Sequence, residues 1–249
     1  MGEELIAVRR VSPYSPNAAR PWSPNNVMKL GREFVADTFI RGQGIEIGAL
    51  HMPLGVPRSA KVRYVDRLSV QDLRKHYPEL NDKDLVDVDI IADGERLESI
   101  LEATQDFVIA NHFVEHCQNP IGAVLNMFRV LKPGGVLYVA LPDKRCSFDV
   151  DRPVTTLGHL LQDFQDGPEW SRRQHFEEWT RLVNKVSDDE EAERQIALNL
   201  GMDYSIHYHV WTQAEMLELI VELRKMVSFE LELCLKNGGE VIFILRKNG

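Results

Sequence analysis

Positive charge is scarce in this sequence of 249 residues. Its 29 Lys and Arg side chains are outnumbered by 38 Asp and Glu side chains, which gives a formal net charge of −9. A protein that holds nucleic acid through its phosphates needs clustered cations. The composition therefore argues against a dedicated nucleic-acid binder.

Cysteines and long apolar runs are also scarce. The three cysteines, at positions 117, 146 and 234, are widely spaced and odd in number, which predicts neither a disulfide framework nor a zinc motif. No apolar stretch approaches the roughly 20 residues that span a bilayer, and the first residues lack the pattern of a signal peptide. These absences predict a cytoplasmic protein with no membrane partner.

The sequence predicts one domain preceded by a proline-rich segment. Residues 1–24 carry Pro at 13, 16, 21 and 24, which favours extended chain, either a lead-in or a strap over a site. Residues 25–249 form the expected domain, with a helical insertion at 144–210. An insertion of that length is able to cover a pocket.

Strand and helix patterns alternate through the domain. Strands are expected to end at Ile47 and to cover 61–66, 86–92, 106–110 and 136–141, and two more should cover 227–234 and 241–245. Helices are expected at 27–39, 69–76, 97–103, 121–131, 156–164, 169–185, from a capping box at Ser187 onward, and at 212–225. The alternation predicts a doubly wound, mostly parallel seven-stranded sheet, and Asn237-Gly238 predicts a C-terminal antiparallel hairpin.

Acidic residues follow the second and third predicted strands. Parallel α/β sheets bind nucleosides at the carboxyl ends of their strands. Asp66 is placed to accept both ribose hydroxyls, and Asp93 to reach an adenine edge. Glu46 interrupts an apolar strand, where a buried carboxylate needs a partner, and Gly48 permits a close backbone approach to a ligand.

Five stretches together resemble a known family. They are 44–50, 62–66, 87–97, 106–117 and 130–143, the last with its Leu-Lys-Pro-Gly-Gly. The sequence resembles the class I S-adenosylmethionine-dependent methyltransferases of small-molecule type, with their Rossmann-like fold. Its first loop departs from the usual repeated glycines and is similar to a branch often found beside glycan-assembly enzymes.

The resemblance implies S-adenosylmethionine as cofactor. Together with the strand ends, it names the expected cofactor-binding residues: Glu46, Ile47, Gly48, Ala49, Leu50, Asp66, Arg67, Asp93, Gly94, Asn111 and His112.

The pentad 112–116 reads His-x-x-Glu-His, an inverted zinc-protease motif. That function needs the pentad on a helix, whereas here it directly follows an apolar strand and Pro120 comes soon after. We expect Asn111 and His112 near the methionine end of the cofactor, Glu115 and His116 in a short turn, and no metal.

Candidate catalytic residues lie where the chain returns from the insertion. His207-Tyr208-His209-Val210-Trp211 alternates like a strand, which would place both histidines on one face. This pattern predicts either a packed polar and aromatic patch or a histidine that deprotonates the acceptor. His116 and Asp143 are the next candidates for the base.

The expected function is methyl transfer to a small molecule, for example to a hydroxyl of a sugar or another metabolite. One alternative is an inactive S-adenosylmethionine-binding or scaffold protein of the same fold. A nicotinamide oxidoreductase also needs an acid after the second strand, but Gly-x-Gly-x-x-Gly does not follow the first strand. The sequence leaves the acceptor and the oligomeric state open.

Overall fold

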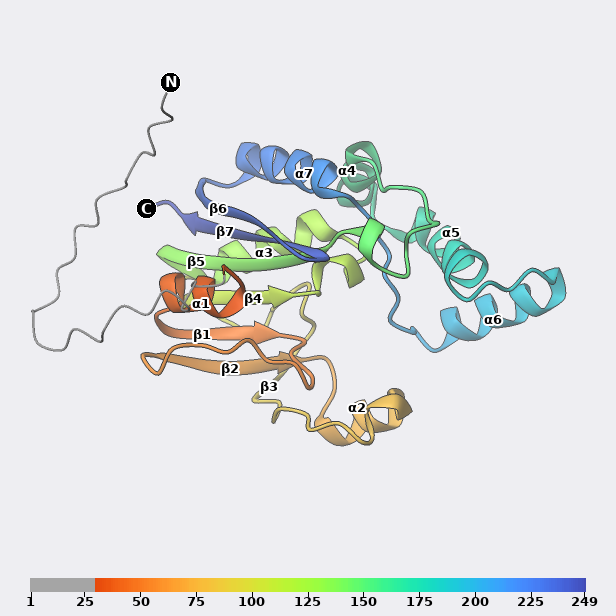
Figure 1. The fold of residues 1–249 in the computed structure, drawn as a ribbon, viewed down its shortest axis with the longest axis horizontal. Helices are drawn as coiled ribbons and strands as arrows, with labels where there is room; N and C mark the ends of the chain where they lie inside the picture. The colour runs from red at the N-terminus through yellow and green to blue at the C-terminus, as the bar shows by residue number, and fades with distance from the viewer. Residues whose placement is uncertain (1–29) are drawn as a thin grey trace, which may run out of the picture.

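The computed structural model describes residues 30–249 and contains one seven-stranded sheet (Figure 1). The proline-rich segment 1–24 and the expected start of the first helix lie outside the described residues. The strand order is β3-β2-β1-β4-β5-β7-β6. No helix among residues 30–249 is both long and apolar enough to cross a membrane.

The predicted sheet and its C-terminal hairpin are confirmed. The strands are β1 (Gly42–Ile47), β2 (Ala60–Asp66), β3 (Ile90–Ile91), β4 (Gln105–Asn111), β5 (Leu131–Pro142), β6 (Phe229–Asn237) and β7 (Glu240–Lys247). The first five strands pair in parallel, whereas β7 lies antiparallel between β5 and β6. The hairpin turn places Gly238 at a φ of +62°, where a glycine is least strained.

Alternating side chains of the central strands build a core on each face of the sheet. In β4, Val108 and Ala110 pack with the larger cluster, beneath α3 (Pro120–Val130) and α7 (Gln213–Met226). Phe107 and Ile109 face the opposite way and pack with α1 (Arg32–Phe39). This period of two follows from the strand geometry, and it fixes the carboxyl ends of the strands between two helical layers.

Several predicted boundaries were wrong. The first helix begins at Arg32, because Leu30 and Gly31 are not helical. The third strand is two residues long instead of spanning 86–92. It lies at the sheet edge and follows an Asp-rich stretch, a composition that strands disfavour. The N-cap of α6 (Asp189–Gly201) is Asp188 and not Ser187.

The helix expected at 97–103 is absent, and turns occupy that segment. Leu97 and Ala103 have φ values of +51° and +52°, which interrupt a right-handed helix. The Arg129 side chain on α3 donates hydrogen bonds to the carbonyls of Leu97 and Ile100 at 2.9 and 3.1 Å. Tertiary contacts thus satisfy carbonyl groups that a helix would have used.

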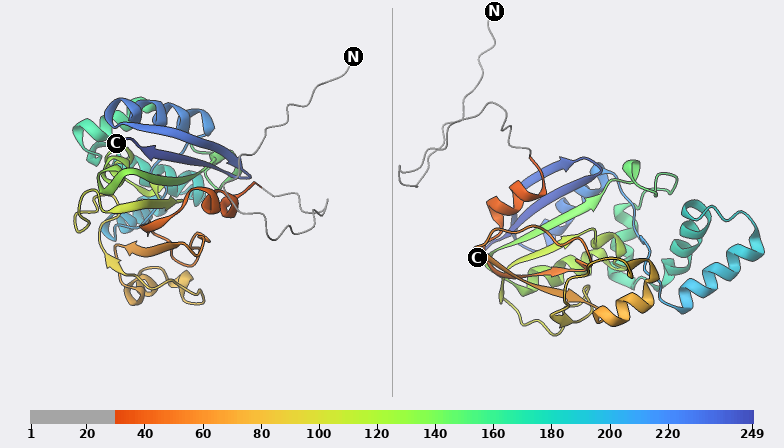
Figure 2. Two further views of the ribbon diagram at one scale, coloured as in Figure 1. Left: turned by 90° about the vertical axis from the view of Figure 1, so that its left-hand side faces the viewer. Right: turned by 60° about the horizontal axis from the view of Figure 1, so that its bottom comes forward.

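Between β5 and α7 the chain forms helices that lie beyond the carboxyl ends of the parallel strands (Figures 1 and 2). They are α4 (Leu157–Asp166), α5 (Glu169–Glu178), its π-helical continuation Trp179–Val183, and α6. α2 (Val70–His76) and short turns at Pro78–Leu80, Val114–His116 and Lys144–Cys146 lie at other connections.

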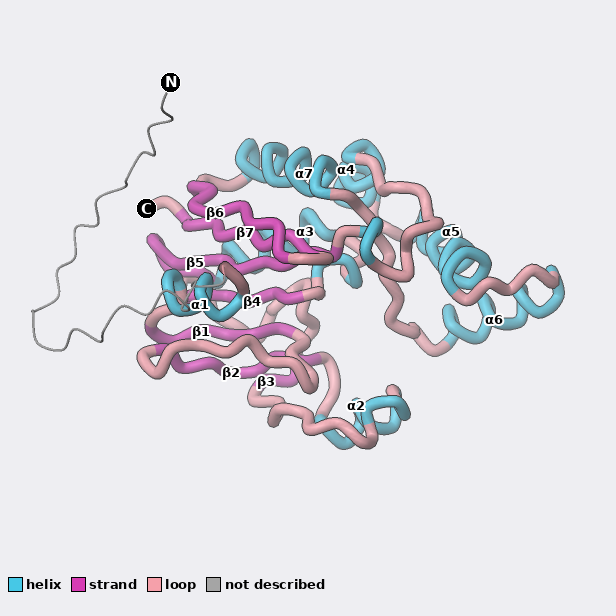
Figure 3. Tube along the Cα trace, viewed as in Figure 1, coloured by secondary structure: helices cyan, strands magenta, loops and turns pink. Residues whose placement is uncertain are grey.

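The return from α6 to α7 is a loop and not a strand (Figure 3). Only Trp211 makes an isolated bridge, with Asp143. His207 and His209 therefore do not form the shared strand face that their alternation suggested.

Candidate functional site

The strand order of the sheet reverses between β1 and β4. These two strands are parallel neighbours, with Glu46 opposite Ile109. The chain leaves β1 toward one edge of the sheet and leaves β4 toward the other. Ligands of open α/β sheets bind at such a point, outside the carboxyl ends of the strands.

Glu46 holds the loop that follows β1. Its fully buried carboxylate accepts two hydrogen bonds from the Leu54 N–H, at 2.9 and 3.1 Å, and faces Asn111 Nδ2 at 3.5 Å. Burial raises the pKa of Glu46 to about 7, although the Leu54 and Asn111 contacts act in the opposite direction. The carboxyl group thus fixes the path of the loop formed by Ile47, Gly48, Ala49 and Leu50.

Two glycines of the predicted site are required by geometry. Gly48 has a φ of +65°, which strains any residue with a side chain. A Cβ on Gly94 would lie 2.6 Å from the Phe113 ring and 2.7 Å from Ile47. Gly94 therefore lets the turn after β3 pack closely against the end of β1.

The two predicted acids lie at strand ends as expected. Asp66 Oδ1 accepts a hydrogen bond from the Leu68 N–H at 3.3 Å, and burial raises the pKa of Asp66. Asp93 Oδ1 accepts one from the Glu95 N–H at 2.8 Å. The Asp93 side chain is half exposed, so it is open to a ligand.

The side chains of the other predicted polar residues have different surroundings. Asn111 Oδ1 is buried and has no hydrogen-bond partner among residues 30–249. His112 Nε2 lies 2.8 Å from a carboxylate oxygen of Glu240, at the start of β7. The Arg67 side chain binds Asp203 and Tyr77. It points toward the insertion, so only its backbone remains next to Asp66.

A separate cleft of about 730 Å³ opens beside β2. Its lining includes His51, Tyr64 and Asp89, but none of the predicted cofactor-binding residues. The candidate site therefore lies at the carboxyl ends of the parallel strands and not in this cleft.

Residues 35–219 match a family model described as a methyltransferase domain. The chain belongs to this methyltransferase family. The predicted resemblance and the predicted cofactor, S-adenosylmethionine, are confirmed. A comparison with curated proteins finds no match.

Several solved structures are similar to this chain at low sequence identity. A protein from Rhodobacter sphaeroides named for zinc-dependent alcohol dehydrogenases is 14% identical with a TM-score of 0.53, over 87% of this chain and 88% of the other. An S-adenosylmethionine-dependent methyltransferase from Thermotoga maritima is 15% identical with a TM-score of 0.45, over 87% and 90%. One from Methanosarcina mazei is 15% identical with a TM-score of 0.45, over 84% and 93%. Only the first comparison has a TM-score above 0.5. At 14% identity, it supports a shared fold and nothing more.

The polar groups at these strand ends suit a nucleoside cofactor. Asn111 offers a buried acceptor atom with no partner among residues 30–249, and Gly48 directly follows the neighbouring strand β1. Asp66 uses one carboxylate oxygen in its turn, which leaves the other for a hydroxyl group. Unpaired buried polar atoms are rare in folded proteins unless a ligand or water satisfies them.

His207 is paired with an aspartate that the sequence analysis did not single out. His207 Nδ1 lies 2.7 Å from Asp149 Oδ2, and both side chains are buried. Burial alone would raise the pKa of Asp149, but His207 and the buried Arg152 lower it below its usual value. No motif links Asp149 to His207, which lie on opposite sides of the insertion in the sequence.

The remaining predicted catalytic residues have other partners. His116 Nδ1 lies 2.9 Å from the Ile206 carbonyl, and burial lowers the pKa of His116 to about 3. Asp143 forms an ion pair with Arg145 at 2.6 Å, and the hydrogen bond from Arg145 lowers the pKa of Asp143 to about 2. His209 is buried 3.7 Å from Asp163. Of these three, only His116 lies beside His207, with ring centroids 4.7 Å apart.

Proposed function

We propose that this methyltransferase transfers the methyl group of S-adenosylmethionine to a hydroxyl group of a small acceptor, with His207 as general base. The observation that carries the proposal is the buried pair of His207 and Asp149, 2.7 Å apart. It adjoins the short turn Val114–His116 that follows β4, because the Glu115 carbonyl accepts a hydrogen bond from the Tyr208 N–H at 2.8 Å. The bound cofactor supplies an electrophilic methyl group.

Asp149 sets the tautomer of His207. A carboxylate only accepts hydrogen bonds, so the proton of neutral His207 lies on Nδ1 and the lone pair on Nε2. This lone pair can take the proton of an acceptor hydroxyl, and the Asp149 charge stabilises the imidazolium that results. Such a pair is a common arrangement for a general base.

His116 is suited to orient the acceptor but not to deprotonate it. Its Nδ1–H donates to the Ile206 carbonyl, which leaves Nε2 to accept a hydrogen bond. With a pKa near 3, the ring is a weak base at neutral pH.

A small acceptor is favoured by the cover over His207. Only 7% of this residue is exposed, and Phe148 and Trp179 lie against its ring. A sugar or a similar hydroxylated metabolite suits such a confined site better than a polymer does. The branch of the family found beside glycan-assembly enzymes supports the same class.

For the cofactor, we assign Asp66 to the ribose hydroxyls and Asp93 to the adenine edge. The loop from Gly48 to Leu50 and Asn111 would hold the methionine end. Charged hydrogen bonds contribute roughly 1.5–3 kcal/mol each. We therefore expect Asp66→Ala to weaken S-adenosylmethionine binding about tenfold to a hundredfold in calorimetry, and the exposed Asp72→Ala, on nearby α2, to leave it unchanged. An unchanged affinity in Asp66→Ala would contradict this assignment.

The catalytic assignment is tested with His207→Ala and with His76→Ala as a control outside the site. S-adenosylhomocysteine release is measured over a panel of sugars and other hydroxylated metabolites. For the acceptor that reacts, we expect His207→Ala to lower turnover by roughly 10²–10⁴, with cofactor affinity changed less than about threefold.

Asp149→Asn tests whether Asp149 acts by orienting the His207 ring and not by supporting the overall structure. We expect it to lower turnover and to shift the acidic limb of the pH–rate profile, while the cofactor affinity stays unchanged. Parental turnover in His207→Ala would show that the base lies elsewhere. Cofactor binding without S-adenosylhomocysteine release over the whole panel would favour the inactive binding protein.

A further inference from the structure

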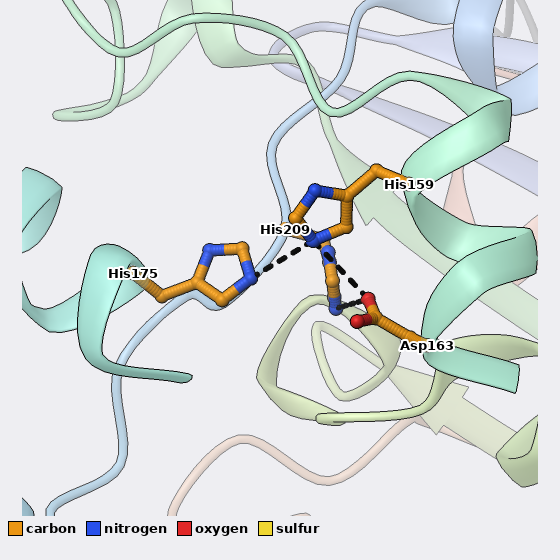
Figure 4. A group of neighbouring side chains, drawn as sticks. All are labelled: His159, Asp163, His175 and His209. Carbon is orange, nitrogen blue, oxygen red and sulfur yellow. Dashed lines mark hydrogen bonds and ion pairs between the residues drawn. The ribbon is translucent and has the colours of Figure 1, made fainter. Parts of the chain in front are cut away.

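A second group of buried titratable side chains lies in the insertion, apart from His207 and Asp149 (Figure 4). We call it the His–Asp cluster. It consists of His159 and Asp163 on α4, His175 on α5 and His209 on the return segment. His159 and Asp163 are four residues apart on one helix, so their side chains lie on the same face.

The ligand atoms of this cluster converge on one point. His159 Nε2 lies 3.1 Å from His175 Nε2 and 3.2 Å from Asp163 Oδ2, and His209 Nε2 lies 3.7 Å from Asp163 Oδ2. All four residues offer an atom within 4.8 Å of the others. In Figure 4 the three imidazoles and the carboxylate face one another.

The carboxylate in the cluster forms no ion pair with a Lys or Arg side chain among residues 30–249. Asp163 is fully buried, and its only ion-pair partners there are His159 and His209. Ser171 Oγ donates a hydrogen bond to Asp163 Oδ1 at 3.0 Å, whereas Oδ2 makes no hydrogen bond within the described part of the chain. A buried, unpaired carboxylate is costly unless a positive charge accompanies it.

The other three members of the cluster are histidines, and His175 and His209 are buried. Neutral imidazoles offer lone pairs, which is the form in which histidine binds a metal. Hydrogen bonds alone do not complete the cluster, because His209 Nε2 reaches the Gln118 carbonyl only at 3.4 Å, beyond the usual range.

Three of the six separations between ligand atoms are close to the edge of a tetrahedron around a metal ion. Zinc binds imidazole nitrogen and carboxylate oxygen at roughly 2.0–2.2 Å, which places neighbouring ligand atoms about 3.3–3.6 Å apart. The three measured separations of 3.1, 3.2 and 3.7 Å lie around this value. We propose that the His–Asp cluster binds one zinc ion in a four-ligand site.

Four protein ligands leave no open position, so the site is structural and not catalytic. The ion would join α4, α5 and the return segment, and it would fix His207 two residues from a ligand. The proposal departs from the expectation of no metal, because the ligands come from three segments that no sequence motif connects. It does not depend on the identity of the acceptor or of the base.

The test uses the full chain, purified without added chelator. We expect elemental analysis to find about one zinc per chain and chelation to lower the melting temperature, which ZnCl₂ then restores. Replacement by Co²⁺ should give the intense visible absorption of a tetrahedral site with nitrogen and oxygen ligands. The proposal is overturned if the folded protein contains no bound metal and its melting temperature does not respond to ZnCl₂.

Variants locate the ion. His175→Gln and Asp163→Asn should each weaken zinc binding at least tenfold, and Ser171→Ala roughly tenfold to a hundredfold through the orientation of Asp163. His76→Gln and His207→Ala should keep the metal. The same variants distinguish the His–Asp cluster from a second candidate metal site, formed by Glu115, His116 and His207. If His207→Ala loses zinc and His175→Gln retains it, the ion lies in the second site and our assignment is refuted.

Should the ligand variants fail to fold, the parental protein still decides the matter. X-ray absorption of the zinc-loaded chain should show a first shell of four nitrogen and oxygen atoms with scattering from three imidazoles. A shell of one or two imidazoles would contradict the His–Asp cluster.

Discussion

The chemical role of each histidine side chain in this protein depends on the groups around it. Of the eight histidines, His207 binds a carboxylate through Nδ1, whereas His116 donates to a backbone carbonyl. His209, two residues after His207, belongs to the group around Asp163. Spacing along the chain identified this region as important, but the partner of each ring decides its chemistry.

Glu46 should make the stability of the protein depend on pH. Burial raises the pKa of its carboxyl group from 4.5 to about 7. Between these values the folded chain keeps a proton that the unfolded chain releases. The contribution of this group to stability is therefore complete below about pH 4.5 and falls as pH rises through 7.

Glu46→Gln, which mimics the protonated side chain, should remove this dependence. We expect the unfolding free energy of the parent to fall relative to that of Glu46→Gln between pH 5 and pH 7.5, measured by urea denaturation at several pH values. The exposed Glu98→Gln serves as control and should follow the parent. If parent and Glu46→Gln give parallel curves, the carboxyl group does not titrate in this range.

At the scale of elements, local sequence patterns predicted helices correctly where few tertiary contacts compete with them. The helix predicted at 212–225 is present as α7, and it begins with a capping box of Thr212 and Glu215. The helix expected at 97–103 failed because the Arg129 side chain binds its carbonyl groups. Helical propensity is a weak preference, which tertiary contacts readily override.

The α7 cap allows a direct measurement. Thr212 Oγ1 accepts a hydrogen bond from the Ala214 N–H at 3.3 Å and donates to Glu215 Oε2 at 2.6 Å. We expect Thr212→Ala to lower the unfolding free energy by about 1 kcal/mol, measured by urea denaturation. Thr38→Ala, on the exposed surface of α1, should change it by less than about 0.5 kcal/mol. Equal effects of the two substitutions would argue against a stabilising cap.

At the scale of the whole molecule, exposed ion pairs of Asp203 connect parts of the insertion with each other and with the segment after β2. Asp203, just after α6, binds Arg172 on α5 at 2.7 Å and Arg67 after β2 at 3.2 Å. Exposed ion pairs contribute little to global stability. Their effect should appear in local opening, which needs less free energy than unfolding of the sheet.

Asp203→Asn should therefore loosen the return segment without unfolding the protein. Asn tolerates the φ of +48° at this position. We expect faster hydrogen exchange at residues 199–206, unchanged exchange in β4 and β5, and an unfolding free energy within about 1 kcal/mol of the parent. Glu193→Gln, which removes an exposed pair with Arg173 inside the insertion, should leave exchange at 199–206 unchanged. Faster exchange throughout β4 would show that the ion pairs support the whole fold.

The sequence alone determined the order of the strands and of most helices, the parallel sheet with its terminal hairpin, and the strand ends that carry Glu46, Asp66 and Asn111. These features follow from local periodicity, from turn residues and from the rule that carboxyl ends of parallel strands meet at one edge. Only the tertiary structure paired Asp149 with His207 and gathered His159, Asp163, His175 and His209. The reason is physical: these contacts join helices and loops whose relative positions depend on packing, and no local pattern encodes that packing.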